Sequence, residues 1–169
     1  PYLLIDEYDF SPTWAGLGLT AGALTWALAA ELQGRFGDRV GNTRIAVIGS
    51  SLLFAAVIIA AATAALQLPP AVMIGRWALS GLGMGLMYPR LTVLTLAYSA
   101  PQNQGFNSSA LSISDSIGSA STMAIMGVVF TALASTGAGF TAVFLISAVL
   151  AVVALIPGLR LGHAAETRV

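Results

Sequence analysis

Apolar residues follow one another in five long stretches of this chain, with short polar breaks between them. An α-helix needs about 20 mostly apolar residues to cross the hydrocarbon core of a bilayer, and each stretch provides that length. The stretches lack the strict apolar–polar alternation of barrel strands, so they predict helices. We expect membrane spans at residues 13–32, 45–66, 72–97, 108–133 and 140–159.

The breaks between the expected spans are rich in turn-forming residues, as in "GDRVGNTR", "QLPPA", "SAPQNQG" and "STGAG". Such short connections predict antiparallel neighbours in an all-α helical bundle. Residues 163–169 then form a tail after the last span.

The composition agrees with a location in lipid. Hydrophobic residues make up 57% of the chain and charged residues 8%, against about 25% charged residues in an ordinary soluble domain. The net charge is zero, so nothing indicates a nucleic-acid partner. The chain has no cysteine, which excludes disulfides and thiolate metal sites. We also find no catalytic motif or cluster of metal ligands, and we predict no enzyme activity, cofactor or metal.

Arginines gather between the first two spans and after the last one, whereas the first ten residues are acidic. The positive-inside rule therefore predicts an outer N-terminus and a cytoplasmic C-terminus. An odd number of spans agrees with this orientation.

Small residues form two stripes at helical spacing. One stripe contains Gly18 and Gly22 in the first span, and the other contains Gly81 and Gly85 in the third. Such stripes let helices approach closely. They occur in helices that only pack together and also in bundles whose helices move against one another. Spans 45–66 and 140–159 are nearly uniformly aliphatic, so we expect them to face lipid on most sides.

The break after the first span reads "GRFGDRVGNTR" and fits the pattern G-x-x-x-D-R-x-G-x-x-R. The matching positions are Gly34, Asp38, Arg39, Gly41 and Arg44. Glycines here permit a tight turn with positive φ, and Asp38 suits a helix N-terminus. The pattern resembles the loop after the second helix of each half of major facilitator superfamily transporters. Anchoring of the topology by the arginines is the simpler role.

Three further segments resemble the drug:proton antiporter branch of that superfamily: "PYLLIDEYDFSPTWAGLGL", "GLGMGLMYPRLTVLTL" and "NSSALSISDSIGSA". The resemblance implies that residues 1–162 are the C-terminal transmembrane half of a transporter in the plasma (inner) membrane. The N-terminal half and most of one helix would be missing. The implied partners are lipid, a small-molecule substrate, protons and that N-terminal half.

Two charges fall inside the expected spans. Arg90 and Asp115 both lie about nine residues from the cytoplasmic ends of their helices, hence at one depth. An isolated carboxylate in the bilayer costs about 2.5–3.5 kcal/mol on insertion scales, so a pair between Arg90 and Asp115 would relieve both charges. Pro89 and the nearby glycines predict a hinge in the same span.

Asp115 is also the centre of a polar stripe on its span, formed at helical spacing with Ser108, Ser112, Ser119 and Thr122. An ion pair does not need such a run of hydroxyls, whereas a water-filled path or a polar substrate surface does. Packing through hydroxyl bonds to i−4 carbonyls is the alternative. Tyr88 and Met87 lie near the proline of the preceding span and complete the expected cavity lining.

The leading prediction is a secondary transporter that exports small organic molecules, drugs included, in exchange for protons by alternating access. Asp115 is the expected coupling residue, and Arg90 is its partner or binds an anionic substrate group. One alternative is uptake of a nutrient or organic anion, favoured by Arg76 and Arg90 on one helix face. The other is a non-transporting membrane scaffold or interaction subunit, in which Asp115 and Arg90 form a structural clasp.

Overall fold

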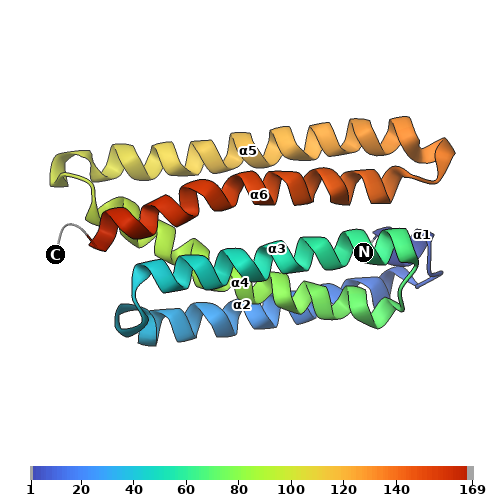
Figure 1. The fold of residues 1–169 in the computed structure, drawn as a ribbon, viewed down its shortest axis with the longest axis horizontal. Coiled ribbons are helices and arrows are strands. Elements are labelled where there is room, and N and C mark those ends of the chain that lie inside the picture. The colour runs from blue at the N-terminus through green and yellow to red at the C-terminus, as the bar shows by residue number, and fades with distance from the viewer. Residues whose placement is uncertain (1, 167–169) are drawn as a thin grey trace.

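The computed structural model describes the backbone of residues 2–166, and the side chains as far as Val153 apart from that of Thr43. A short helix, α1 (Tyr2–Asp6), precedes five long ones. These are α2 (Pro12–Val40), α3 (Asn42–Leu66), α4 (Pro70–Ala97), α5 (Gln104–Leu133) and α6 (Gly139–Glu166), with 3-10 turns on either side of α5. Residues 2–166 contain no strand. The long helices run lengthwise, with α5 and α6 in one layer beside α2, α3 and α4 (Figure 1). The prediction of an all-α bundle is confirmed.

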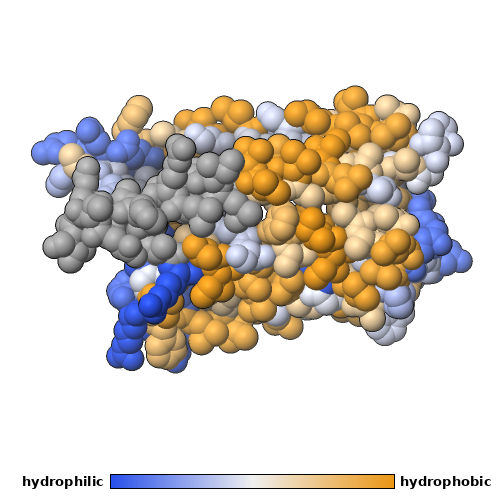
Figure 2. Space-filling view, viewed as in Figure 1, coloured by the Kyte–Doolittle hydropathy of each residue, from blue (hydrophilic) through white to orange (hydrophobic). Residues whose placement is uncertain are grey.

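Three helical segments of the described chain are long and apolar enough to cross a membrane. They are Pro12–Val40, Arg44–Leu66 and Pro101–Thr136, and Gly139–Val153 is a shorter apolar helix. On the face shown in Figure 2, apolar side chains form a wide band across the middle, and polar side chains gather at the two ends. Such a band is what the hydrocarbon of a bilayer requires. Five crossings and the orientation of the termini stay predictions.

The segment expected as the first cytoplasmic loop is mostly helical. Helix α2 continues to Val40, and α3 begins at Asn42. The whole reversal takes place at Gly41, whose φ of 90° confirms the expected positive value. A side chain at this φ would be strained, so glycine allows a one-residue turn. At the other end of the chain, α6 extends to Glu166, into the segment expected as a tail, and residues 167–169 lie outside the described part.

Helix α4 lies between α2 and α3, and its glycines bring its backbone into direct contact with the backbones of both. A methyl group on Gly81 would overlap the carbonyl oxygen of Gly22 in α2. A methyl group on Gly83 would lie 2.9 Å from the carbonyl oxygen of Gly49 in α3. Glycines two positions apart point to opposite sides of a helix, so α4 can approach two neighbours at once. The Thr25 hydroxyl of α2 crosses the same contact and donates to the Ala78 carbonyl at 2.8 Å.

These contacts assign the small-residue stripes to packing. The expected hinge region of α4 is occupied by neighbouring backbone at Gly81, Gly83 and Gly85, and the helix is continuous from Pro70 to Ala97. The glycines therefore hold α4 in place against α2 and α3.

The expectation that residues 45–66 face lipid on most sides is wrong. Helix α3 packs against α4 on one side and α6 on another, and it buries Ala56, Ala60 and Thr63. Small apolar side chains allow close approach as well as lipid exposure, so a uniform sequence does not distinguish the two. Helix α5, by contrast, buries no residue.

Helix α1 covers one end of the bundle. Leu3 and Leu4 form a buried cluster with Ala15 of α2 and Met73 of α4. The Tyr8 hydroxyl, just after α1, donates to the carbonyl of Leu68 in the turn between α3 and α4. Burial raises the pKa of this phenol, which keeps the donating proton on the oxygen. The segment thus ties three helices together at this end.

The α2–α4 contact predicts a position-specific effect of adding one methyl group. Gly81→Ala should lower the stability of the folded protein by about 1–3 kcal/mol, because the methyl group pushes α2 and α4 apart. Gly75→Ala on the same helix is the matched control, since nothing lies within 4 Å of its added methyl group. Thermal unfolding in detergent measures both variants. Equal midpoints for the two would contradict the assignment of Gly81 to a helix contact.

Candidate functional site

A cavity of about 290 Å³ opens between α4 and α5. Its apolar wall consists of Leu53, Met84, Met87, Leu91 and Leu111. Its polar groups come from Tyr88, Thr92, Ser108, Ser112 and Asp115. A largely apolar cavity with a few convergent polar groups is the usual form of a small-molecule site.

Asp115 provides the only carboxylate in this lining. It lies on α5, and the Tyr88 hydroxyl of α4 donates to its Oδ2 at 3.3 Å. Ser112 and Ser108 precede it on α5 by roughly one and two helical turns and line the same cavity. The carboxylate therefore faces a space bounded by hydroxyls and apolar side chains.

The structure brings together only part of the predicted stripe. Asp115, Ser108 and Ser112 line one cavity together with Tyr88 and Met87. Ser119 and Thr122 lie farther along α5, where they are exposed and outside the cavity lining. The cavity is therefore lined only by the part of the stripe that lies nearest the α4–α5 turn.

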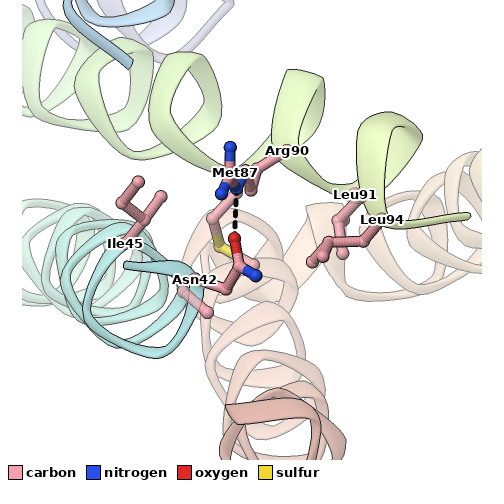
Figure 3. Close-up of a pocket in the computed structure, with 7 residues that line it drawn as sticks. Asn42, Ile45, Met87, Arg90, Leu91 and Leu94 are labelled. Carbon is pink, nitrogen blue, oxygen red and sulfur yellow. Dashed lines mark hydrogen bonds between the residues drawn. The ribbon is translucent and has the colours of Figure 1, made fainter. Parts of the chain in front are cut away.

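The expected pair between Arg90 and Asp115 is wrong. The Nη1 of Arg90 donates to Oδ1 of Asp38 at 2.9 Å. Its Nε donates to Oδ1 of Asn42, as Figure 3 shows. Arg90 and Tyr88 are two positions apart, so their side chains leave α4 about 200° apart. Because Tyr88 faces α5, Arg90 faces the turn between α2 and α3.

Arg90 bridges the two sides of the one-residue turn at Gly41. Asp38 lies in the last turns of α2, and Asn42 is the first residue of α3. The Arg90 side chain is 14% exposed, whereas that of Asp38 is 94% exposed. Asp38 therefore pairs with a largely buried arginine. The expectation that it caps a helix N-terminus is not met, because Asp38 lies in the last turns of α2.

The other positions of the sequence pattern lie around this arginine cluster of Arg90, Asp38 and Asn42. Gly34 is exposed on α2 and has nothing within 4 Å of an added methyl group. Arg39 and Arg44 are exposed on either side of the turn. Met87 and Leu91 line both the α4–α5 cavity and a small cavity of about 20 Å³ beside Arg90. These two side chains separate the arginine cluster from Asp115.

Several residues of the site were not predicted from the sequence. Asn42, which accepts a hydrogen bond from Arg90, is one of them, and its place directly after the turn glycine is a signal that could have indicated it. Met84 and Thr92 lie one turn before and after Tyr88, so helical spacing could have identified them. Leu53 enters the cavity from α3, and no local pattern indicates such a contact.

No described arginine lines the α4–α5 cavity. Arg76, nearer the other end of α4, places its guanidinium 4.3 Å from the ring centre of Trp77 and 5.8 Å from that of Phe144. Its Nε contacts the sulfur of Met73 at 3.1 Å. Among the described residues, no group of three or more His, Cys, Asp or Glu side chains could hold a metal ion.

Comparison with known proteins gives one result. A family model described as Major Facilitator Superfamily matches residues 1–167, which include the cavity and the arginine cluster. Neither a curated protein nor a solved structure gives a significant match.

The arginine cluster predicts a ranking of two arginine substitutions. Arg90→Met should lower stability by about 1–3 kcal/mol, because it removes hydrogen bonds from a largely buried group to both sides of the turn. Arg35→Met removes an exposed i,i+4 pair with Glu31 and should cost only about 0.3–0.5 kcal/mol. Thermal unfolding of both variants in one detergent tests this ranking. A larger loss for Arg35→Met would contradict the cluster.

Proposed function

Because the chain belongs to the major facilitator superfamily, whose members are secondary transporters rather than enzymes, we propose that it works in a proton-coupled exporter of small organic molecules. The chain is an integral membrane protein. In this proposal it forms the C-terminal half of a transporter of the drug:proton antiporter branch. It crosses the plasma (inner) membrane five times and ends in the cytoplasm.

The observation that carries the proposal is the carboxylate of Asp115 in the wall of the α4–α5 cavity. A carboxylate binds either a proton or a cationic group, and each excludes the other. Two ligands that compete for one group are negatively coupled, which is the requirement for exchange. The apolar wall formed by Met84, Met87 and Leu111 provides the contact surface for an organic body.

The surroundings of Asp115 support a functional role over a structural one. Charged groups within membrane segments are costly and usually mark ion or substrate pathways. Here the carboxylate accepts a hydrogen bond from Tyr88, and Arg90 is engaged elsewhere with Asp38 and Asn42. Asp115 is thus left available to a ligand from the cavity.

Transport in this proposal follows from motion of this half against the N-terminal half. The backbone contacts of α4 with α2 and α3, together with Arg90, hold these three helices as one unit. Helix α5 carries Asp115 on the exposed side of that unit, where it buries no residue of its own. The carboxylate therefore lies where relative motion changes its access.

Two other functions lose the features that favoured them. Uptake of an organic anion depended on Arg76 and Arg90 near the substrate, and neither lines the cavity. A structural clasp depended on a pair between Arg90 and Asp115, and Arg90 binds Asp38 and Asn42 instead. The carboxylate cavity therefore favours proton-coupled export.

Transport assays with the full-length protein in proteoliposomes test the proposal. A pH gradient is imposed, and uptake of radiolabelled tetraphenylphosphonium, an organic cation with an apolar surface, is followed. Asp115→Asn keeps the size and hydrogen bonding of the side chain but cannot titrate. We expect gradient-driven transport to fall at least about tenfold, as for loss of an essential group.

Asp9→Asn is the matched control for this assay. Asp9 lies outside the cavity, and asparagine also tolerates its left-handed backbone with φ of 57°. This variant should transport at the rate of the unmodified protein. A folded Asp115→Asn variant that still follows the pH gradient at that rate would overturn the assignment of coupling to Asp115.

A further inference from the structure

Tyr88 connects three helices around the candidate site. Its ring lies against that of Trp26 in α2, with the ring centres 6.1 Å apart and the planes tilted by 58°. Its hydroxyl, at the other end of the side chain, donates to Asp115 in α5 at 3.3 Å. One side chain of α4 thus contacts an aromatic ring on one neighbour and a carboxylate on another.

The contact between Trp26 and Tyr88 is held by the helix backbones. A methyl group on Gly85 would overlap the carbonyl oxygen of Trp26 and lie 2.8 Å from the Cβ of Ala29. Gly85 and Tyr88 are three positions apart and therefore neighbours on one face of α4. The close approach at Gly85 brings Trp26 beside Tyr88. A tilted aromatic pair at this separation is attractive and limits rotation of both rings.

Hydrogen bonds between α4 and α5 are few in the described structure. Near the turn that joins the two helices, the Gln104 side chain donates to the Leu96 carbonyl, and Asn107 donates to Ser99. Beyond this turn, the contact between Tyr88 and Asp115 is the one such bond among the described residues. Tyr88 is therefore the residue of α4 that hydrogen-bonds to α5 beyond this turn in the described structure.

We propose that Tyr88 is the positioning residue of Asp115: its ring is braced by Trp26, and its hydroxyl fixes the carboxylate toward the α4–α5 cavity. The proposal rests on the proposed function, in which Asp115 binds the proton or the cation. It adds that Trp26 of α2 holds the ring of Tyr88 and thereby sets the orientation of the Asp115 carboxylate.

Among the described residues on other helices, Tyr88 is the one that donates a hydrogen bond to Asp115. Helix α4 also carries Arg90, which faces Asp38 and Asn42. Helix α3 contributes Leu53 to the cavity, and α6 has no charged side chain between Gly139 and Val153. On α5 itself, the cavity receives the hydroxyls of Ser108 and Ser112.

Infrared spectroscopy of the full-length protein with isotope-labelled aspartate tests the positioning directly. The carboxylate stretching band of Asp115, observed in alkaline buffer, is identified by its loss in Asp115→Asn. Tyr88→Phe keeps the ring and removes the donor, so this band should move to higher wavenumber. Tyr98→Phe is the matched control at the exposed end of α4 and should leave the band in place.

The variant Trp26→Leu tests whether Trp26 acts on Asp115 through the ring of Tyr88 or only through the packing of the helices. If Trp26 acts through Tyr88, Trp26→Leu should move the Asp115 band in the same direction by a smaller amount. Added to Tyr88→Phe, it should move the band no further. The proposal would be overturned if the Asp115 band did not move in Tyr88→Phe. It would also be overturned if Trp26→Leu moved the band by the same amount in the unmodified protein and in Tyr88→Phe.

The transport assay of the same proteins separates this proposal from the proposed function. Loss of gradient-driven transport in Asp115→Asn, together with an unmoved band in Tyr88→Phe, would overturn the positioning and leave the function in place. Normal transport by Asp115→Asn, together with the expected band shifts, would overturn the function and support the positioning of Asp115 by Tyr88.

Discussion

The close contact of α4 with both α2 and α3 is the constraint on which the rest of the structure depends. At Gly81, Gly83 and Gly85, the surrounding backbone leaves little or no room for a side chain. Contact on two sides fixes the rotation of α4 about its own axis. Tyr88 and Arg90 follow the glycines on the same helix, so the directions of their side chains are fixed by that rotation.

This rotation separates two kinds of polar chemistry on one helical turn. Arg90 joins Asp38 and Asn42 across the turn between α2 and α3, where its charge stabilises the fold. Tyr88 points to α5 and contacts Asp115 in the cavity. Met87 and Leu91 lie between the two sites. Because the arginine is used by the scaffold, the carboxylate is the charged group that the cavity retains among the described residues.

Helices α3 and α5 show how composition and packing differ. Helix α3 has the plainer sequence, and yet it packs between α4 and α6 through small residues such as Ala56 and Ala60. Helix α5 carries the polar stripe, and yet it buries nothing. In a membrane protein, apolar residues are stable both against lipid and against other helices, so hydrophobicity does not report burial. Residue size, as at Gly49 and Gly83, indicates close contact more directly.

By itself the sequence determined the helical class and the presence of the long apolar helices, because hydrophobic length is a local property. It did not place the turn between α2 and α3, since the segment expected as a loop is helical as far as Val40 and the chain reverses at Gly41. It also predicted Asp115, Ser108 and Ser112 as cavity residues from their shared helix face, and Tyr88 and Met87 from their position beside Pro89. All five line the α4–α5 cavity, and their roles stay predictions. The partner of Arg90 was decided only by the tertiary structure. Equal depth in two helices made a pair with Asp115 plausible, but rotation of each helix about its axis decides which side chains meet. That rotation follows from interhelical contacts between residues far apart in the sequence.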